Sequence, residues 1–358
     1  MIGAVILAIL IYSAICFYIG YNGWVWLKAR NLIQWKKIHI VVVICLSLSV
    51  FAGQLLPIYI FKIISGFWLA VVGYSLIILP IINLLVYLMG KRSIVWAGNV
   101  VGVLYIFILI YGSYLAWNPT THTFDIQVEK SNEKRDHLKI LMASDIHAGV
   151  LVGNTHLEKL VSIAEKEKPD IILIPGDLID DYIEPYLKQD MGKVMEKLSA
   201  PLGVYAVLGN HDYYGDDTKQ ILTEMDKAGI TVLTDEWVEV EDFYLIGRKD
   251  PTDESRRPLK EFIGDIDRSK PLIMLDHQPI DFSEASETGI DVMLSGHTHR
   301  GQLFPASIVT NLLYENDYGY EKMENLHTFV SSGFGLWGPP LRLGTQSEVF
   351  VINIEFKQ

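Results

Sequence analysis

Five strand-like apolar runs in this chain each end in residues that commonly bind metal ions. The segments that follow these runs are Ser144-Asp145-Ile146-His147, Gly176-Asp177, Gly209-Asn210-His211-Asp212, Asp276-His277 and Gly296-His297-Thr298-His299. In open sheets, ligands gather beyond the carboxyl ends of the strands. We therefore expect these five segments, which are far apart in sequence, to meet at one place.

The candidate ligands are two carboxylates, one amide and four imidazoles: Asp145, His147, Asp177, Asn210, His277, His297 and His299. They are too many for one four-coordinate ion and suit two ions that share a bridging carboxylate. Imidazole and carboxylate ligands favour Zn, Fe or Mn over Mg or Ca, which prefer oxygen. Two ions about 3.5–4 Å apart can hold the attacking and leaving oxygens of a displacement at phosphorus. The pattern therefore predicts phosphoester hydrolysis.

Each segment taken alone has a simpler interpretation. Asp145-x-His147 and Gly176-Asp177 are weak signals that ordinary surface loops also carry. His277 has the least context, and a hydrogen-bonded core histidine is its alternative. The acidic run Asp180-Asp181 is typical of a solvated face. The occurrence of all five segments in order, each after a strand-like run, makes a shared metal site the better hypothesis.

The elements that must position these residues alternate in type along the chain. Apolar runs at 138–142, 171–174 and 204–208 alternate with helical patterns at 155–168, 184–198 and 217–228, which indicates a βαβαβ order. Later strand-like runs lie closer together. We expect a mixed sheet, or two sheets packed face to face with helices outside. Residues 138–358 are enough for one domain of this kind.

The chain before this domain is apolar and contains four candidate membrane spans. They are Ile2–Trp26, Ile38–Phe61, Ile63–Met89 and Ile94–Trp117. Each exceeds the roughly 20 residues that cross a bilayer core, and none has the polar face of a helix in a soluble domain. We predict a transmembrane domain at 1–117, a linker at 118–137 with a strand at Thr123–Val128, and a catalytic domain at 138–358.

Charge divides the chain in the same way. Residues 1–120 contain seven Lys or Arg and no Asp or Glu, so the remainder carries a net charge of −19. Four basic residues lie between the first two spans and two between the last two, against Lys62 alone in the second connection. Because positive loops stay cytoplasmic, we expect the catalytic domain to be extracytoplasmic. Its acidity argues against nucleic acid as a partner, since phosphate backbones are bound by Lys and Arg.

The same segments resemble the motif set of the calcineurin-like metallophosphoesterases. The resemblance covers roughly residues 138–355, and its tail, from Gly333 to Gly344, resembles a bacterial branch with membrane-anchored members. It implies a four-layer α/β (α+β) sandwich, in which two mixed β-sheets are flanked by helices, here preceded by a four-helix transmembrane domain. It implies one metal ion on Asp145, His147, Asp177 and His299 and another on Asp177, Asn210, His277 and His297, with Asp177 bridging.

Further roles are also implied by the resemblance. His211 would contact the phosphate and act as an acid for the leaving group, with Asp180 and Asp212 orienting His211 or the ligands. Arg342 and Arg300 are candidate contacts of the substrate phosphate, although surface arginines would give the same pattern. Trp337 either lines the cleft or packs beneath the last loop.

Our interpretation is an integral membrane enzyme that hydrolyses a phosphodiester or phosphoanhydride, with a lipid-linked phosphate among the candidate substrates. A metal-bridging hydroxide would attack phosphorus, and two divalent ions, with Mn favoured over Fe or Zn, would form the centre. The alternatives are a phosphomonoesterase or nucleotide pyrophosphatase on soluble substrates, and a non-catalytic metal-binding sensor coupled to the helices. The apolar half of the chain predicts the lipid bilayer as a partner.

Overall fold

The computed structural model describes residues 2–55, 59–130, 132, 134–264 and 266–357. Its contacts divide the chain into two compact units. One unit comprises residues 1–114 with 338–341, and the other comprises 115–337 with 342–358. The boundary falls near the end of the last apolar helix, so that its final residues pack with the catalytic domain.

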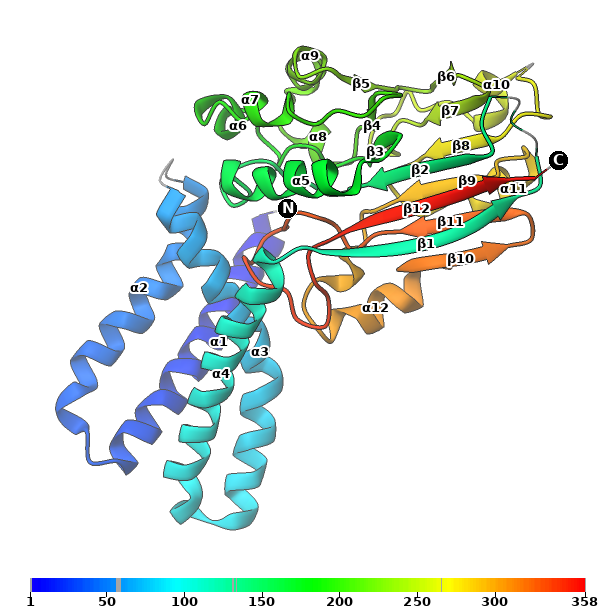
Figure 1. Ribbon diagram of the computed structural model, residues 1–358. Coiled ribbons are helices and arrows are strands. Elements are labelled where there is room, and N and C mark those ends of the chain that lie inside the picture. The colour runs from blue at the N-terminus through cyan, green and yellow to red at the C-terminus, as the bar shows by residue number, and fades with distance from the viewer. Residues whose placement is uncertain (1, 56–58, 131, 133, 265, 358) are drawn as a thin grey trace. The chain divides into compact units, whose positions relative to one another are not determined.

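The first unit is helical (Figure 1). Its long helices are α1 (Ile2–Ala29), α2 (Lys36–Leu55), α3 (Tyr59–Met89) and α4 (Ile94–Trp117), with short 3-10 turns η1 (Ile33–Trp35) and η2 (Lys91–Ser93). All four are long and apolar enough to cross a membrane, with mean hydropathy between 1.8 and 2.4. The expected second connection lies partly at residues 56–58, outside the described residues. Lys62 lies inside α3 rather than in that connection, which corrects its predicted position.

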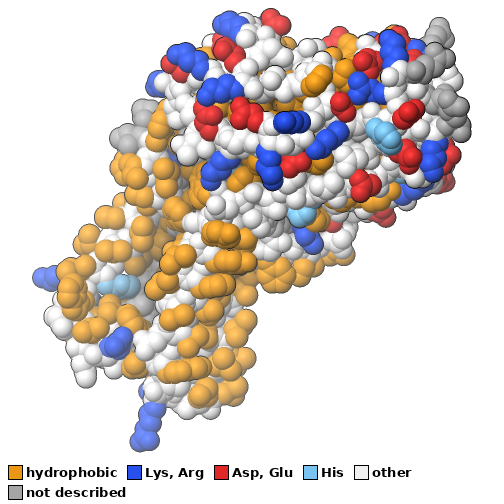
Figure 2. Space-filling model, viewed as in Figure 1, with side chains coloured by type: hydrophobic (Ala, Val, Ile, Leu, Met, Phe, Trp, Pro, Cys, Tyr) orange, Lys and Arg blue, Asp and Glu red, His pale blue; other side chains and the backbone are white. Residues whose placement is uncertain are grey.

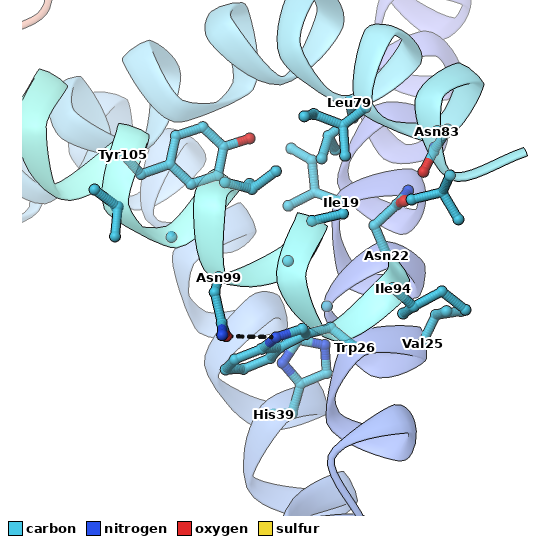
Figure 3. A pocket seen from close by; sticks show the side chains of 18 of the residues that line it. Ile19, Asn22, Val25, Trp26, His39, Leu79, Asn83, Ile94, Asn99 and Tyr105 are labelled. Carbon is cyan, nitrogen blue, oxygen red and sulfur yellow. Dashed lines mark hydrogen bonds between the residues drawn. The ribbon is translucent and has the colours of Figure 1, made fainter. Parts of the chain in front are cut away.

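The helical unit contains a cavity of about 540 Å³ that is lined by side chains of α1, α3 and α4 and by His39 of α2 (Figure 3). Most of its lining is apolar, but Asn22, Asn83 and Asn99 also face it. The indole nitrogen of Trp26 donates to Asn99 Oδ1 at 3.2 Å, and Asn83 Nδ2 donates to the Tyr18 hydroxyl at 2.7 Å. These bonds satisfy amide groups that would be costly to leave unpaired within a bilayer.

The second unit contains two six-stranded sheets. The first has the order β1-β12-β2-β3-β4-β5, and its strands are β1 (Thr120–Val128), β2 (His137–Met142), β3 (Ile171–Pro175), β4 (Val204–Val207), β5 (Ile230–Val232) and β12 (Glu348–Phe356). The second has the order β10-β11-β9-β8-β7-β6, with β6 (Glu236–Val240), β7 (Phe243–Gly247), β8 (Leu272–Leu275), β9 (Val292–Ser295), β10 (Gly319–Met323) and β11 (Leu326–Val330). Both sheets mix parallel and antiparallel pairs.

Three buried clusters hold the sheets and helices in four layers. Alternation along β2 shows the principle: Leu138, Ile140 and Met142 lie in the cluster between the sheets, whereas Leu141 faces the helices. The helices on the first sheet's side are α5 (Asn154–Glu167), α6 (Glu184–Lys188), α7 (Gly192–Met195), α8 (His211–Tyr214) and α9 (Thr218–Lys227). The later ones are α10 (Leu259–Ile263), α11 (Phe282–Glu287), η3 (His299–Gly301) and α12 (Ala306–Leu313). The predicted pair of mixed sheets flanked by helices is confirmed.

Strand β1 is longer than the expected strand and belongs to the first sheet. It pairs in parallel with β12 along its full length, from Thr120 opposite Glu348 to Val128 opposite Phe356. Ile126 and Val128 are buried between the two sheets. The segment expected as a linker therefore supplies an edge strand that covers β12.

A truncation tests whether β1 is part of the folding unit. A fragment of residues 138–358 should aggregate or fail to unfold cooperatively, because it exposes the edge of β12 and opens the core around Ile126. A fragment of residues 115–358 should be monodisperse by size exclusion and melt cooperatively. Equal behaviour of the two fragments would show that β1 is a dispensable linker.

Candidate metal centre

The seven candidate ligands meet at the carboxyl ends of the strands, as the sequence pattern predicts. Each follows β2, β3, β4, β8 or β9 by a few residues. All except His297 are buried, and His297 is half-buried. The aspartates, the amide and the imidazoles thus converge from five loops of both sheets.

The first group of ligands surrounds His299. The Nε2 atoms of His147 and His299 face each other at 3.1 Å, and Asp145 Oδ1 lies 3.5 Å from His299 Nε2. Asp177 Oδ2 lies 3.5 Å from His147 Nε2. These four residues are the set that the resemblance implies for one ion.

The second group shares Asp177 with the first. The same Oδ2 atom lies 3.2 Å from His277 Nε2, which in turn is 3.2 Å from Asn210 Oδ1. His297 Nδ1 is 2.9 Å from that amide oxygen. The Nδ1 atom of His277 is 3.0 Å from the Pro175 carbonyl and can donate to it, so Nε2 is directed into the centre.

Glycine precedes three of the ligands for steric reasons. A Cβ at Gly209 would overlap the carboxylate of Asp177, and a Cβ at Gly296 would overlap that of Asp145. Only Gly176 among the three also has a positive φ, at +89°. Close approach of the backbone to a carboxylate, more than turn geometry, therefore explains glycine at 209 and 296.

Five ligands adopt a backbone conformation that non-glycine residues rarely take. Their φ angles lie between +46° and +68°: Asp145, His147, Asp177, His297 and His299. Each such backbone conformation costs about 1–3 kcal/mol, and it persists only where contacts with the surrounding structure hold it in place. The backbone of Asp145 is held by hydrogen bonds to Gly176 and Gly335, at 3.1 and 2.7 Å. Packing and hydrogen bonds thus offset strain at the centre.

Burial and neighbouring charges set the protonation of the ligands. Burial lowers the pKa of His147 to about 3 and that of His297 to about 4, and it lowers the pKa of His299 as well. Burial alone would raise the pKa of Asp177, but His277 outweighs it and lowers that pKa overall. The centre therefore presents neutral imidazoles at His147, His297 and His299 and an ionised carboxylate at Asp177, the forms that ligate metals, whereas the nearby carboxylates raise the pKa of His277.

This donor set fits divalent ions. Two imidazole nitrogens point at each other within hydrogen-bond distance although burial keeps both rings neutral. Three overlapping groups of close His and Asp ligand atoms contain Asp145, His147, Asp177, His277, His299 and His211. Both nitrogens could instead ligate a cation, and the nitrogen and oxygen donors of these groups suit Zn, Fe or Mn.

His211 lies beside the centre and is held by Asp181. The His211 Nδ1 atom is 2.6 Å from Asp181 Oδ1, and the His211 ring meets the His147 ring edge-on at 4.8 Å. Burial lowers the pKa of His211, but the bond to Asp181 and nearby carboxylates outweigh it and raise the pKa overall. Asp181 was expected on a solvated face, and its side chain is 41% exposed, but it also has a partner in His211 that the sequence did not indicate.

The two aspartates expected to orient other groups have different surroundings. Asp212 is buried and accepts the backbone N–H groups of Gly209, Leu178 and Ile179 at 2.8–3.1 Å. It therefore ties the loop after β4 to the loop after β3. Asp180 Oδ1 lies 3.8 Å from His147 Nδ1. Thus Asp212 supports the backbone, and Asp180 lies behind a ligand.

The two arginines expected at the phosphate make other contacts. Arg342 is fully buried and donates to the carbonyls of Gly333 and Gly335 at 2.9 and 2.8 Å. This corrects the expectation for Arg342, which holds the last loop against the centre instead of facing substrate. The guanidinium of Arg300 lies over the Tyr318 ring at 4.2 Å. A substrate contact by Arg300 remains a prediction.

The contact between His211 and Asp181 generates a prediction. Asp181→Asn should lower the turnover of a phosphoester about 10–100-fold, because an outer residue that orients a catalytic histidine has effects of this size. Metal content should stay unchanged, as measured by elemental analysis. Asp216→Asn, at an exposed position nearby, is the control. Normal turnover in Asp181→Asn, with a loss in Asp180→Asn, would assign the orienting role to Asp180.

Comparison with known proteins identifies the family. The calcineurin-like phosphoesterase family matches residues 138–301. A metallophosphoesterase of Aquifex aeolicus is 35% identical over 244 residues, which cover 65% of this chain and 91% of that protein. One from Campylobacter jejuni is 31% identical and covers 77% and 76% of the two chains. A transmembrane protein with a metallophosphoesterase domain from Danio rerio is 31% identical over 67% of this chain and 58% of its own length. This chain therefore belongs to the calcineurin-like metallophosphoesterases.

Proposed function

We propose that this protein is a membrane-anchored phosphodiesterase with a dinuclear metal centre. Membership of the family supports a phosphoester hydrolase in general. The observation that carries the finer proposal is Asp177, whose Oδ2 atom lies between the imidazoles of His147 and His277. One carboxylate shared by two groups of ligands is the arrangement that two ions require.

The chain's own residues have separable tasks in this proposal. Asp145, His147, Asp177 and His299 would hold one ion, and Asp177, Asn210, His277 and His297 the other. When bound, two divalent ions would supply positive charge to the phosphoryl oxygens and lower the pKa of water. Asp177 Oδ1 accepts the backbone N–H of His211 at 2.9 Å, which couples the shared ligand to the position of the acid.

His211 is the proposed general acid. Asp181 accepts a hydrogen bond from Nδ1–H, so Nε2 is the ring nitrogen whose proton could be transferred. The raised pKa of His211 favours a protonated ring near neutral pH, and that proton would go to the oxygen of the departing alcohol. A diester leaving group needs such a proton because an alkoxide is a poor leaving group.

The assay that tests this function compares two chromogenic substrates. The full-length protein with Mn²⁺ should hydrolyse a nitrophenyl phosphodiester faster than the matching monoester, and a chelator should abolish both activities reversibly. His211→Ala should retain the metal and lower the turnover of an alkyl phosphodiester about 10²–10⁴-fold, since it removes a general acid. The nitrophenyl diester should lose less, because nitrophenolate leaves without protonation. Asp190→Ala, at an exposed carboxylate, is the control. Faster monoester hydrolysis would favour a phosphomonoesterase, and bound metal without turnover would favour a sensor.

We propose that the catalytic domain lies outside the cytoplasmic membrane of a multi-pass protein. The basic residues at the turn from α1 to α2 and those between α3 and α4 support this orientation. They are Lys28 at the end of α1, Arg30, Lys36 and Lys37 at the start of α2, and Lys91 and Arg92. Alkaline phosphatase fused after Gln358 should therefore be active, and a fluorescent protein that folds only in the cytoplasm should stay dark. The opposite pair of results would place the catalytic domain in the cytoplasm.

A further inference from the structure

Helix α12 turns its apolar side chains to the outside of the catalytic domain. Ile308 and Val309 are each 55% exposed, and Leu312 and Leu313 are 80% and 73% exposed. Residues at these spacings share one face of a helix. No residue of α12 is buried. An exposed face of four large aliphatic side chains is unusual on a soluble domain.

Two polar side chains of α12 bond Asp317, in the segment that follows the helix. Thr310 Oγ1 donates to Asp317 Oδ2 at 2.7 Å, and Asn311 Nδ2 is 3.3 Å from Asp317 Oδ1. The backbone carbonyl of Asp317 accepts a hydrogen bond from Thr298, between two of the ligands. An ordinary surface helix packs its apolar face on the core, whereas the apolar face of α12 is exposed. The hydrogen bonds through Asp317 connect α12 to the loop that carries His297 and His299, and the apolar face of α12 stays exposed.

Two aromatic residues extend this face. Phe304 is 52% exposed and Trp337 is 53% exposed. The side chain of Gln302 bonds both the backbone N–H and the carbonyl of Trp337, at 3.0 and 2.7 Å, which joins the two loops. The apolar ridge is defined by these residues and the four of α12: Phe304, Ile308, Val309, Leu312, Leu313 and Trp337. Hydrophobic side chains gather along this edge of the catalytic domain in Figure 2.

One residue of the apolar ridge and the residue that follows α12 both lie near the metal centre. The Trp337 ring lies 6.2 Å from the His211 ring, measured between centroids. Tyr314, which follows α12, lies 6.2 Å from the ring of the ligand His297. Whatever covers the ridge therefore also lies beside the proposed acid and one of the ligands.

The chemistry of the ridge favours a lipid surface as its occupant. Residues 303–314 contain no charged side chain, whereas protein interfaces usually carry a polar rim. Helix α4 ends at Trp117 and β1 begins at Thr120, so the domain starts directly after a candidate span. Leu115 accepts a backbone hydrogen bond from Ser347 at 3.1 Å, which shows that the end of α4 is built into the domain. The end of a candidate span and the apolar ridge thus belong to the same compact unit.

We propose that the apolar ridge inserts into the interfacial layer of the bilayer that holds the four helices. Interfacial helices bury their apolar face by about 5–10 Å, with aromatic residues at the headgroup level. The insertion would hold the centre at the membrane surface, where phosphate groups of lipids are concentrated. A role of the ridge in access to lipid phosphates rests on the proposed phosphoesterase function, whereas the insertion itself does not.

Depth-dependent quenching tests the insertion in the full-length protein. Cys16 and Cys45, the two cysteines of the chain, are replaced by alanine, and Leu312→Cys is labelled with an environment-sensitive fluorophore. In proteoliposomes of phosphatidylcholine and phosphatidylglycerol, spin-labelled lipids should quench this label at least twofold, with a blue-shifted emission. Lys193→Cys, whose side chain is 74% exposed on α7, should show little quenching and serves as the matched control.

Other outcomes would overturn the proposal. Equal, weak quenching at positions 312 and 193 would show that the ridge stays in water. Energy transfer between labelled copies that rises with protein density, without quenching by lipids, would identify a second copy as the occupant. Leu313→Cys repeats the test at a second position, in case the first variant does not fold.

A kinetic comparison tests the consequence for the substrate. Leu312→Glu should lower the turnover of a phospholipid in vesicles at least tenfold more than it lowers the turnover of a soluble diester. Equal loss on both substrates would reject a role of the ridge in substrate access. If the unchanged protein hydrolyses neither substrate, the proposed function is rejected. The quenching result would still test the insertion of the ridge independently.

Discussion

The buried carboxylate of Asp177 lies between two groups of imidazoles, and the rest of the catalytic domain depends on this contact. One oxygen atom faces His147 and His277, and the other accepts the backbone N–H of His211. The charge of an isolated buried carboxylate would be very costly. The positive charge of His277 offsets that cost here, and divalent ions would do so in the loaded enzyme. Loops from both sheets must therefore come together for the carboxylate to be stable.

Holding these groups together has a local cost. Asp145, Asp177 and His299 adopt left-handed backbone conformations, and glycine is needed wherever the chain passes close to a carboxylate. The packed sheets and the hydrogen bonds of Arg342 to the last loop hold these strained backbone conformations in place. The result is a preorganised set of donors, which does not have to be assembled when ions or substrate bind.

Much of this arrangement could be predicted from the sequence, because strand-like runs followed by His, Asp and Asn identify the residues that converge at the candidate centre. The fold class follows from the alternation of runs and from the motif set. The partner of His211 could not be predicted, since spacing does not tell which of two adjacent aspartates faces the ring. Asp181 does so with a φ of +59°. Burial of Arg342 and the sheet pairing of β1 depend on contacts far along the chain, which local patterns do not report.

The central claim is that Asp177 is shared by two ions, and anomalous X-ray diffraction from crystals grown with Mn²⁺ tests it most directly. The account predicts two anomalous peaks, one on each side of the Asp177 carboxylate, and loss of at least one peak in Asp177→Ala. The first peak should lie among Asp145, His147 and His299, and the second among Asn210, His277 and His297. A single peak, or two peaks that persist unchanged in Asp177→Ala, would contradict a dinuclear centre built around this residue.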